Sequence, residues 1–133
     1  MPSEATVLLK LRAAGAIILG KATMGEWSQC RSRKKSSSHG WSAYGGQPVG
    51  VFHSEQDPHG SSSGSAVAVS AGLAPFALGT ETSGSIVNPC ERNGLIGIKV
   101  RTVSHHQRRT RPVPNEDCHY TIAKQYTAHP RPY

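Results

Sequence analysis

The feature that most constrains this chain is a run of very small residues that begins at Gly60 and extends to Ala71. Its first half holds glycines and serines, which allow tight turns and close approach of the backbone to other segments. Its second half, Ala66–Ala71, predicts a helix of small side chains, and Gly72 provides the expected end of that helix. Such a helix can pack closely against a neighbouring element.

Two strands are predicted after this helix. Pro75–Leu78 and Leu95–Lys99 are short apolar runs, and the turn-rich segment Gly79–Pro89 separates them. Strand and helix alternate along this part of the chain, and such alternation is typical of α/β folds. The predicted fold class is therefore α/β.

The N-terminal segment predicts a helix followed by a strand. Ser3 can cap a helix that runs to about Ala14, because its apolar residues recur at helical spacing. Ala16–Leu19 predicts a short strand that is buried on both faces. Lys21 follows at its carboxyl end, where ligands bind in open α/β sheets.

The basic residues are concentrated in two polar segments. Residues 28–60 predict a loop region, in which Arg31–Lys35 forms a solvated basic run. Residues 100–133 hold no leucine and four prolines, which predicts a disordered tail. We therefore divide the chain into a partial domain over residues 1–99 and a divergent tail over residues 100–133. The net charge is +7, but the basic run has no aromatic residue for base stacking, so nucleic acid is not the expected partner.

Cysteine spacing and hydropathy indicate the compartment. Cys30, Cys90 and Cys118 form an odd set without metal-ligand spacing, so neither a disulfide framework nor a metal site is expected. No apolar run approaches the roughly 20 residues of a membrane span. The N-terminus lacks the pattern of a secretory signal. We expect a cytoplasmic location and no membrane span.

The Gly60–Ser65 cluster offers serine hydroxyls, which become nucleophiles only when a base removes their proton. The chain lacks a convincing Gly-x-Ser-x-Gly elbow with Asp and His partners. A lysine can serve as the base when its pKa is lowered, and Lys21 is a candidate; the alternative is a solvated lysine. The cluster could instead be a flexible linker or a phosphate cradle, although it lacks the lysine of the Walker pattern.

Several ordered motifs resemble the amidase-signature family. Asp57–Ala66 resembles the family's Gly-Gly-Ser-Ser-Gly-Gly-Ser core, and Gly72–Ile86 continues the likeness without a gap. Gly15–Ala22 resembles the segment that carries the family's lysine. The resemblance covers about residues 5–99, and its fungal and plant branch is indicated by Glu26–Trp27 and Gly40–Ala43.

The resemblance implies a partial amidase-signature fold, with a mixed sheet flanked by helices, incomplete, and with a poorly ordered C-terminal tail. It also implies a serine hydrolase that cleaves amide carbon–nitrogen bonds through an acyl-enzyme, without a metal or cofactor. Ser85 would be the nucleophile. Ser61, 24 positions earlier and preceded by a cis peptide bond after Gly60, would pass its proton to a neutral Lys21. The expected partner is a small-molecule amide substrate.

Further site residues are implied by the same resemblance. Backbone N–H groups would stabilise the oxyanion of the reaction, and two side chains would support the triad by hydrogen bonds. The oxyanion donors would belong to Thr82, Ser83, Gly84 and Ser85, and the supporting residues would be Ser62 and Thr80.

The largest departure from the family follows Lys99, where Val100–Ser104 replaces Pro-Thr and a glycine-containing turn. A truncated product or a shifted reading frame is our hypothesis for this break. Two alternatives to an amidase stay open: a catalytically dead remnant of the same fold, and a basic binding module that uses Arg31–Lys35 and the tail. Smaller departures are Ser83 for Gly or Asp, Val87 for a frequent Arg, and Asn88 and Cys90 beside Pro89.

Overall fold

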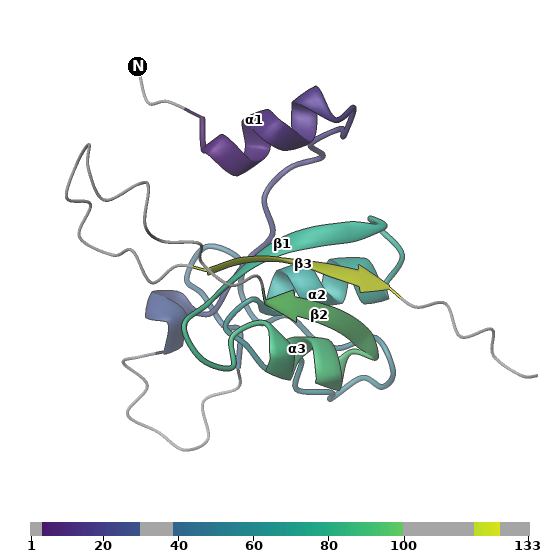
Figure 1. Cartoon of the computed structure of the whole chain (residues 1–133). Helices are drawn as coiled ribbons and strands as arrows, with labels where there is room; N and C mark the ends of the chain where they lie inside the picture. The colour runs from purple at the N-terminus through teal and green to yellow at the C-terminus, as the bar shows by residue number, and fades with distance from the viewer. Residues whose placement is uncertain (1–3, 30–38, 100–118, 126–133) are drawn as a thin grey trace, which may run out of the picture.

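The computed structural model describes residues 4–29, 39–99 and 119–125. The described elements alternate between helix and strand in the second half of the chain (Figure 1). No helix among the described residues is long and apolar enough to cross a membrane. In chain order the elements are α1 (Thr6–Ala13), the 3₁₀ helix η1 (Glu26–Gln29), α2 (Ser63–Ser70), β1 (Phe76–Glu81), α3 (Val87–Arg92), β2 (Leu95–Lys99) and β3 (His119–Gln125).

The sheet has three strands in the order β1-β3-β2, and β3 is antiparallel to both neighbours. Leu78 of β1 and Ile98 of β2 are both paired in register with Ile122. The sheet therefore depends on a strand from the segment that the sequence predicts as a disordered tail. The remainder of that tail, residues 100–118 and 126–133, lies outside the described residues.

Helices α2 and α3 cover one face of the sheet, and α1 lies on the other side (Figure 1). The small side chains of α2 allow close packing, and Ala66 and Val69 are almost completely buried. A compact apolar cluster joins Ile86 and Cys90 to the partly buried Leu95 of β2. The predicted small-residue helix and the predicted strand Leu95–Lys99 are confirmed.

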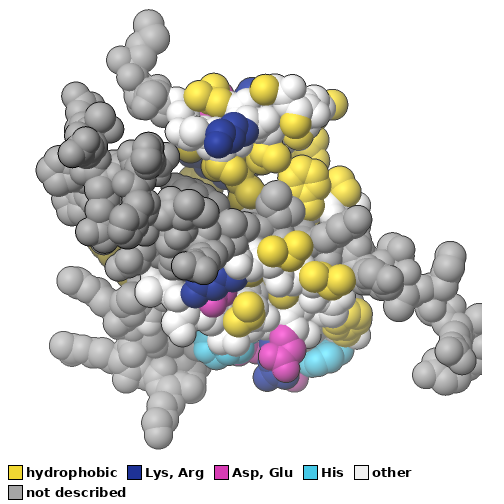
Figure 2. Space-filling model, in the orientation of Figure 1, with side chains coloured by type: hydrophobic (Ala, Val, Ile, Leu, Met, Phe, Trp, Pro, Cys, Tyr) yellow, Lys and Arg dark blue, Asp and Glu magenta, His cyan; other side chains and the backbone are white. Residues whose placement is uncertain are grey.

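The predicted strand at Ala16–Leu19 is wrong, because the structure has no strand there. Ile17 is 84% exposed and Leu19 is 74% exposed, whereas a strand buried on both faces would expose neither. Within the described part of the chain, no backbone hydrogen bond joins Ile17, Ile18 or Leu19 to another segment. A short apolar run becomes a strand only when a neighbour satisfies its backbone groups. Figure 2 shows hydrophobic side chains on the surface below α1.

Two other boundaries differ from the prediction. The segment Gly79–Pro89, predicted as a loop, contains the end of β1 and the start of α3. Pro89 is compatible with α3 because it stands in the first turn, where a missing N–H breaks no helical hydrogen bond. Helix α1 begins at Thr6 without a side-chain cap, and Ser3, the predicted cap, lies outside the described residues.

Removal of residues 100–133 is expected to unfold the sheet, because β1 and β2 are joined through β3. Without β3 the inner backbone groups of both strands lose their partners. Thr80 donates its N–H to the Ser62 hydroxyl, so the alternate amides of Ala77, Gly79 and Glu81 are the ones that face β3. Hydrogen exchange of these three amides should accelerate to near the rate of an unstructured peptide. Removal of residues 126–133 alone is the control and should leave these amides protected. Equal protection in both truncated chains would contradict the sheet order.

Candidate active site

The backbone that follows Lys21 is hydrogen-bonded to the turn that holds Ser61. Gly25 N–H donates to the Ser61 carbonyl oxygen at 2.9 Å, and Gly64 N–H donates to the Thr23 carbonyl oxygen at 3.1 Å. The close contact between these two segments requires glycine at position 64. A Cβ there would lie 2.5 Å from the carbonyl oxygen of Thr23 and 2.7 Å from the backbone nitrogen of Thr23. The small residues of the sequence therefore allow the Lys21 segment to lie against the serine turn.

Ser62 joins the same turn to the segment of Ser85. Its N–H donates to the Ser85 carbonyl oxygen at 3.0 Å. Its buried hydroxyl accepts the Thr80 N–H at 3.1 Å and donates to the Thr80 carbonyl oxygen at 3.3 Å. The hydroxyl thus both accepts and donates, and its partner is the backbone of Thr80 rather than the Thr80 side chain.

Ser61 is the most unusual polar residue of this turn. It is 1% exposed, and the peptide bond that joins it to Gly60 is cis. Its side-chain oxygen is buried and has no hydrogen-bond partner among the described residues. A buried hydroxyl without a partner costs about 1–3 kcal/mol, so natural proteins retain such a group where another role requires it.

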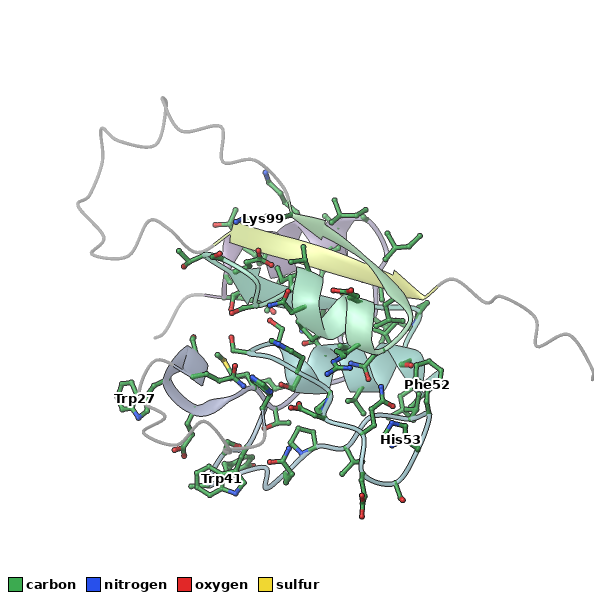
Figure 3. All side chains as sticks on the ribbon, turned by 90° about the horizontal axis from the view of Figure 1, so that it is seen from below. Trp27, Trp41, Phe52, His53 and Lys99 are labelled. Atoms are coloured by element: carbon green, nitrogen blue, oxygen red, sulfur yellow. The ribbon has the colours of Figure 1, made fainter. Side chains whose placement is uncertain are left out.

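The structure brings the segment after Lys21 and the segment of Ser85 to the turn of Ser61, but the side chains of the three residues predicted as catalytic are not hydrogen-bonded to one another. Ser85 is half-buried and Lys21 is exposed. Neither side chain has a hydrogen bond or an ion pair with any residue that the structure describes. Figure 3 shows the described side chains from below, with Trp27 and Trp41 on one side of the molecule and Phe52 and His53 on the other.

Glu81, at the end of β1, is a site residue that sequence reasoning missed. One carboxylate oxygen accepts the Gly84 N–H at 2.7 Å, and the other accepts the N–H groups of Ile86 at 2.7 Å and Val87 at 3.0 Å. The Lys99 ammonium lies 3.6 Å from this carboxylate. A signal was present in the sequence, since an acidic residue a few positions before a helix start can bind its free N–H groups.

The pKa of Glu81 lies below its ordinary value. Burial of the side chain opposes ionisation, but the donated N–H groups of Val87, Gly84 and Ile86, together with Lys99, outweigh that effect. The ionised carboxylate therefore fixes the loop on which Ser85 lies.

Four backbone N–H groups were predicted to stabilise an oxyanion, and one of them is occupied. Gly84 donates its N–H to Glu81 and has a φ of +84°, a conformation that glycine adopts without strain. The N–H groups of Thr82, Ser83 and Ser85 have no acceptor among the described residues.

Other reactive groups in the described chain do not compete with the serines. Burial, and then the negative charge of Glu81, raise the pKa of Cys90 to about 11, so its thiol is protonated at neutral pH. The described residues contain no group of three or more His, Cys, Asp and Glu side chains that could hold a metal ion. A small cavity between α2, β1 and α3 is lined by Ser62 but not by Lys21, Ser61 or Ser85.

Comparison with known proteins identifies the family. Residues 1–113 match the model of the Amidase family. The chain is 52% identical over 97 residues to an amidase-family protein of Arthroderma benhamiae, an alignment that covers 73% of this chain and 16% of that protein. It therefore belongs to the Amidase family.

Solved structures agree with this assignment. The native peptide amidase from Stenotrophomonas maltophilia superposes with a TM-score of 0.65 and 50% identity, over 71% of this chain and 19% of that chain. An amidase family protein from Bacillus anthracis superposes with a TM-score of 0.68 and 41% identity, over 72% of this chain and 19% of that chain. The chain thus spans about a fifth or less of the length of these relatives.

Gly64→Ala is expected to destabilise the fold, although alanine normally stabilises a helix by about 0.5–1 kcal/mol relative to glycine. The new Cβ would collide with the backbone of Thr23, and overpacking of this kind costs about 1–3 kcal/mol. Urea denaturation measures the change. Gly20→Ala is the matched control, because a Cβ there meets nothing within 4 Å. A Gly64→Ala chain as stable as the Gly20→Ala chain would show that the two segments are not in contact.

The pH dependence of stability should contain a contribution from Glu81. Its pKa is lowered on folding, so the carboxylate stabilises the fold above its ordinary pKa of about 4.5 and this stabilisation is lost as the pH falls through the lowered value. Glu81→Gln should cost about 1.5–3 kcal/mol at pH 7, the range for hydrogen bonds to charged groups. It should also flatten the acid limb of the free energy of unfolding plotted against pH. Glu55→Gln, at an exposed carboxylate, should do neither; an equal loss in both variants would contradict the assignment.

Proposed function

We propose that this chain carries the catalytic residues of a serine amidase, which hydrolyses amide carbon–nitrogen bonds through an acyl-enzyme. The observation that carries the proposal is the Ser61 hydroxyl, which is buried and has no partner among the described residues. Its turn is hydrogen-bonded on one side to the segment of Ser85 and on the other to the segment after Lys21. Membership of the Amidase family and the likeness to a peptide amidase support an amide as the substrate class.

In the proposed reaction, the Ser85 hydroxyl oxygen attacks the carbonyl carbon of the amide. Its proton passes to the Ser61 hydroxyl, which gives its own proton to the neutral amine of Lys21. The tetrahedral oxyanion accepts hydrogen bonds from the N–H groups of Thr82, Ser83 and Ser85, which have no acceptor among the described residues. Collapse expels the amine, which takes the proton back along the same route, and water then hydrolyses the acyl-enzyme to a carboxylic acid.

Ser62 and Thr80 take supporting roles in this proposal. The reciprocal hydrogen bonds between the Ser62 hydroxyl and the Thr80 backbone hold the turn of Ser61 against β1. The Ser62 N–H holds the Ser85 carbonyl oxygen. Because its own hydroxyl is engaged with Thr80, Ser62 is a weaker nucleophile candidate than Ser85.

A second candidate, a catalytically inactive remnant of the same fold, is favoured by the exposure of Lys21. A lysine base must be neutral, which requires burial or nearby positive charge. The described residues do not bury Lys21, so we expect turnover of this 133-residue chain to be low. The binding-module alternative stays a prediction, because Arg31–Lys35 lies outside the described residues.

Labelling with a serine-directed fluorophosphonate, followed by mass spectrometry of the peptides, tests the proposal. The adduct is expected on Ser85 and should be absent in Ser85→Ala. Lys21→Ala should slow labelling by about 100-fold or more, as loss of a general base does. Lys10→Ala, at an exposed lysine of α1, is the control and should label like the unmodified chain.

Two outcomes would contradict the assignment of roles. An adduct on Ser62 with Ser85 unmodified would show that Ser62, and not Ser85, is the nucleophile. Equal labelling rates in Lys21→Ala and Lys10→Ala, with the fold retained, would leave Lys21 as an ordinary solvated lysine.

A further inference from the structure

A polar cluster outside the proposed catalytic residues lies directly before Ser61 in the chain. It consists of His39, Asp57 and His59. The two imidazole rings are stacked, with centroids 4.1 Å apart and planes inclined by 11°. One Asp57 carboxylate oxygen is hydrogen-bonded to His39 Nδ1, and the other accepts the backbone N–H of His59 at 2.8 Å. The proposed reaction uses none of these groups.

The hydrogen bonds determine the tautomer of each ring. Burial of Asp57 opposes its ionisation, but the bonds from His39 and from the His59 backbone outweigh that effect and lower its pKa. An ionised carboxylate can only accept, so His39 carries its proton on Nδ1. The Gly60 N–H donates to His59 Nδ1 at 2.9 Å, so this nitrogen must hold a lone pair and the proton of neutral His59 is on Nε2. The Gly60 carbonyl oxygen is farther from the same nitrogen, at 3.3 Å.

His59 is held at its N–H, its ring and its carbonyl oxygen. Its N–H is bound by Asp57, its Nδ1 by Gly60, and its carbonyl oxygen by the hydroxyl of Ser63. Its φ is +61°, a left-handed conformation that non-glycine residues adopt only when their surroundings compensate. The conformation of the two residues that lead into Ser61 is therefore fixed by side chains.

The cluster also connects the turn to the segment that holds His39 and Gln47. Gln47 donates its side-chain N–H to the His39 carbonyl oxygen at 2.9 Å, so His39 is held from both its ring and its backbone. A change at His39 can thus reach Ser61 through Asp57 and His59.

We propose that His39, Asp57 and His59 form a positioning cluster for Ser61, with the two stacked rings in opposite tautomers. Its functional consequence rests on the proposed role of Ser61 in proton transfer, since a relay of this kind needs its groups held to about 0.5 Å. A metal site explains the cluster less well, because Nε2 of neutral His59 carries a proton and Nδ1 is bound to Gly60.

Substitutions at His59 separate the ring acceptor from the backbone conformation. Glycine tolerates the positive φ but has no acceptor for the Gly60 N–H. Asparagine also tolerates the left-handed region, and its side-chain oxygen can occupy the place of Nδ1. His59→Gly should therefore release Gly60, whereas His59→Asn should hold it. His53→Asn is the matched control, because His53 is exposed. In Figure 3 it lies beside Phe52, on the side of the molecule away from Trp41.

Nitrogen-15 NMR of the full chain tests the tautomers directly. The expected spectrum has His39 protonated on Nδ1 and His59 protonated on Nε2. The two rings in the same tautomer would overturn the proposal. This measurement requires no variant and no enzymatic activity.

Hydrogen exchange at the Gly60 amide and labelling of Ser85 complete the test. Exchange should be at least about tenfold faster in His59→Gly than in the unmodified chain, and near the original rate in His59→Asn and His53→Asn. Labelling of Ser85 should fall at least about tenfold in His59→Gly and recover in His59→Asn. If the unmodified chain is not labelled, the proposed function fails while the tautomers and the Gly60 exchange still decide on the cluster. An unchanged exchange rate of the Gly60 amide in His59→Gly would overturn the proposed positioning cluster.

Discussion

Three backbone hydrogen bonds at the serine turn hold the described structure together around the candidate site. They join Ser61 to Gly25, Gly64 to Thr23, and Ser62 to the segment of Ser85. Side chains larger than hydrogen at position 64 would separate the segments, so the contact exists because the turn is built from glycine and serine. The same short turn therefore determines both how the chain packs and which residues lie near one another.

The part of the fold that carries Ser85 depends on a different interaction, the hydrogen bonds of the Glu81 carboxylate. Its apolar cluster is small, and a buried carboxylate at the end of β1 organises the next segment by accepting three N–H groups. Lys99, the last residue of β2, balances the charge of Glu81 and donates to the Thr82 carbonyl oxygen at 2.6 Å. The loop of Ser85, the start of α3 and the end of β2 are thus held by the Glu81 carboxylate rather than by extensive apolar packing.

Sequence reasoning succeeded where local chemistry decides the structure. The helix of small residues and the strand at Leu95–Lys99 follow from composition and periodicity, and both are present. The cis bond before Ser61, implied by the family resemblance, is also present. The prediction of a strand at Ala16–Leu19 was wrong, because a strand requires a partner and hydropathy does not show whether one is present. The place of β3 could not be predicted for the same reason, since strand pairing joins segments that are distant in the chain.

The site shows the same division between what the sequence does and does not predict. The family resemblance predicted Lys21, Ser61 and Ser85, and the structure brings the segment after Lys21 and the segment of Ser85 to the turn of Ser61 without joining the three side chains. Glu81 had a local signal in the sequence, as an acidic residue a few positions before a helix start. The contacts among His39, Asp57 and His59 depend on three-dimensional approach and have no short sequence pattern.

The central claim is that the serine turn joins the Lys21 segment to the segment of Ser85. Native-state hydrogen exchange at the amides of Gly25, Ser62 and Gly64 tests it most directly, because these three N–H groups form the joining bonds. The account predicts that all three are protected and open with one common free energy. Protection at Ser62 alone, with Gly25 and Gly64 exchanging at the rate of a free peptide, would contradict it.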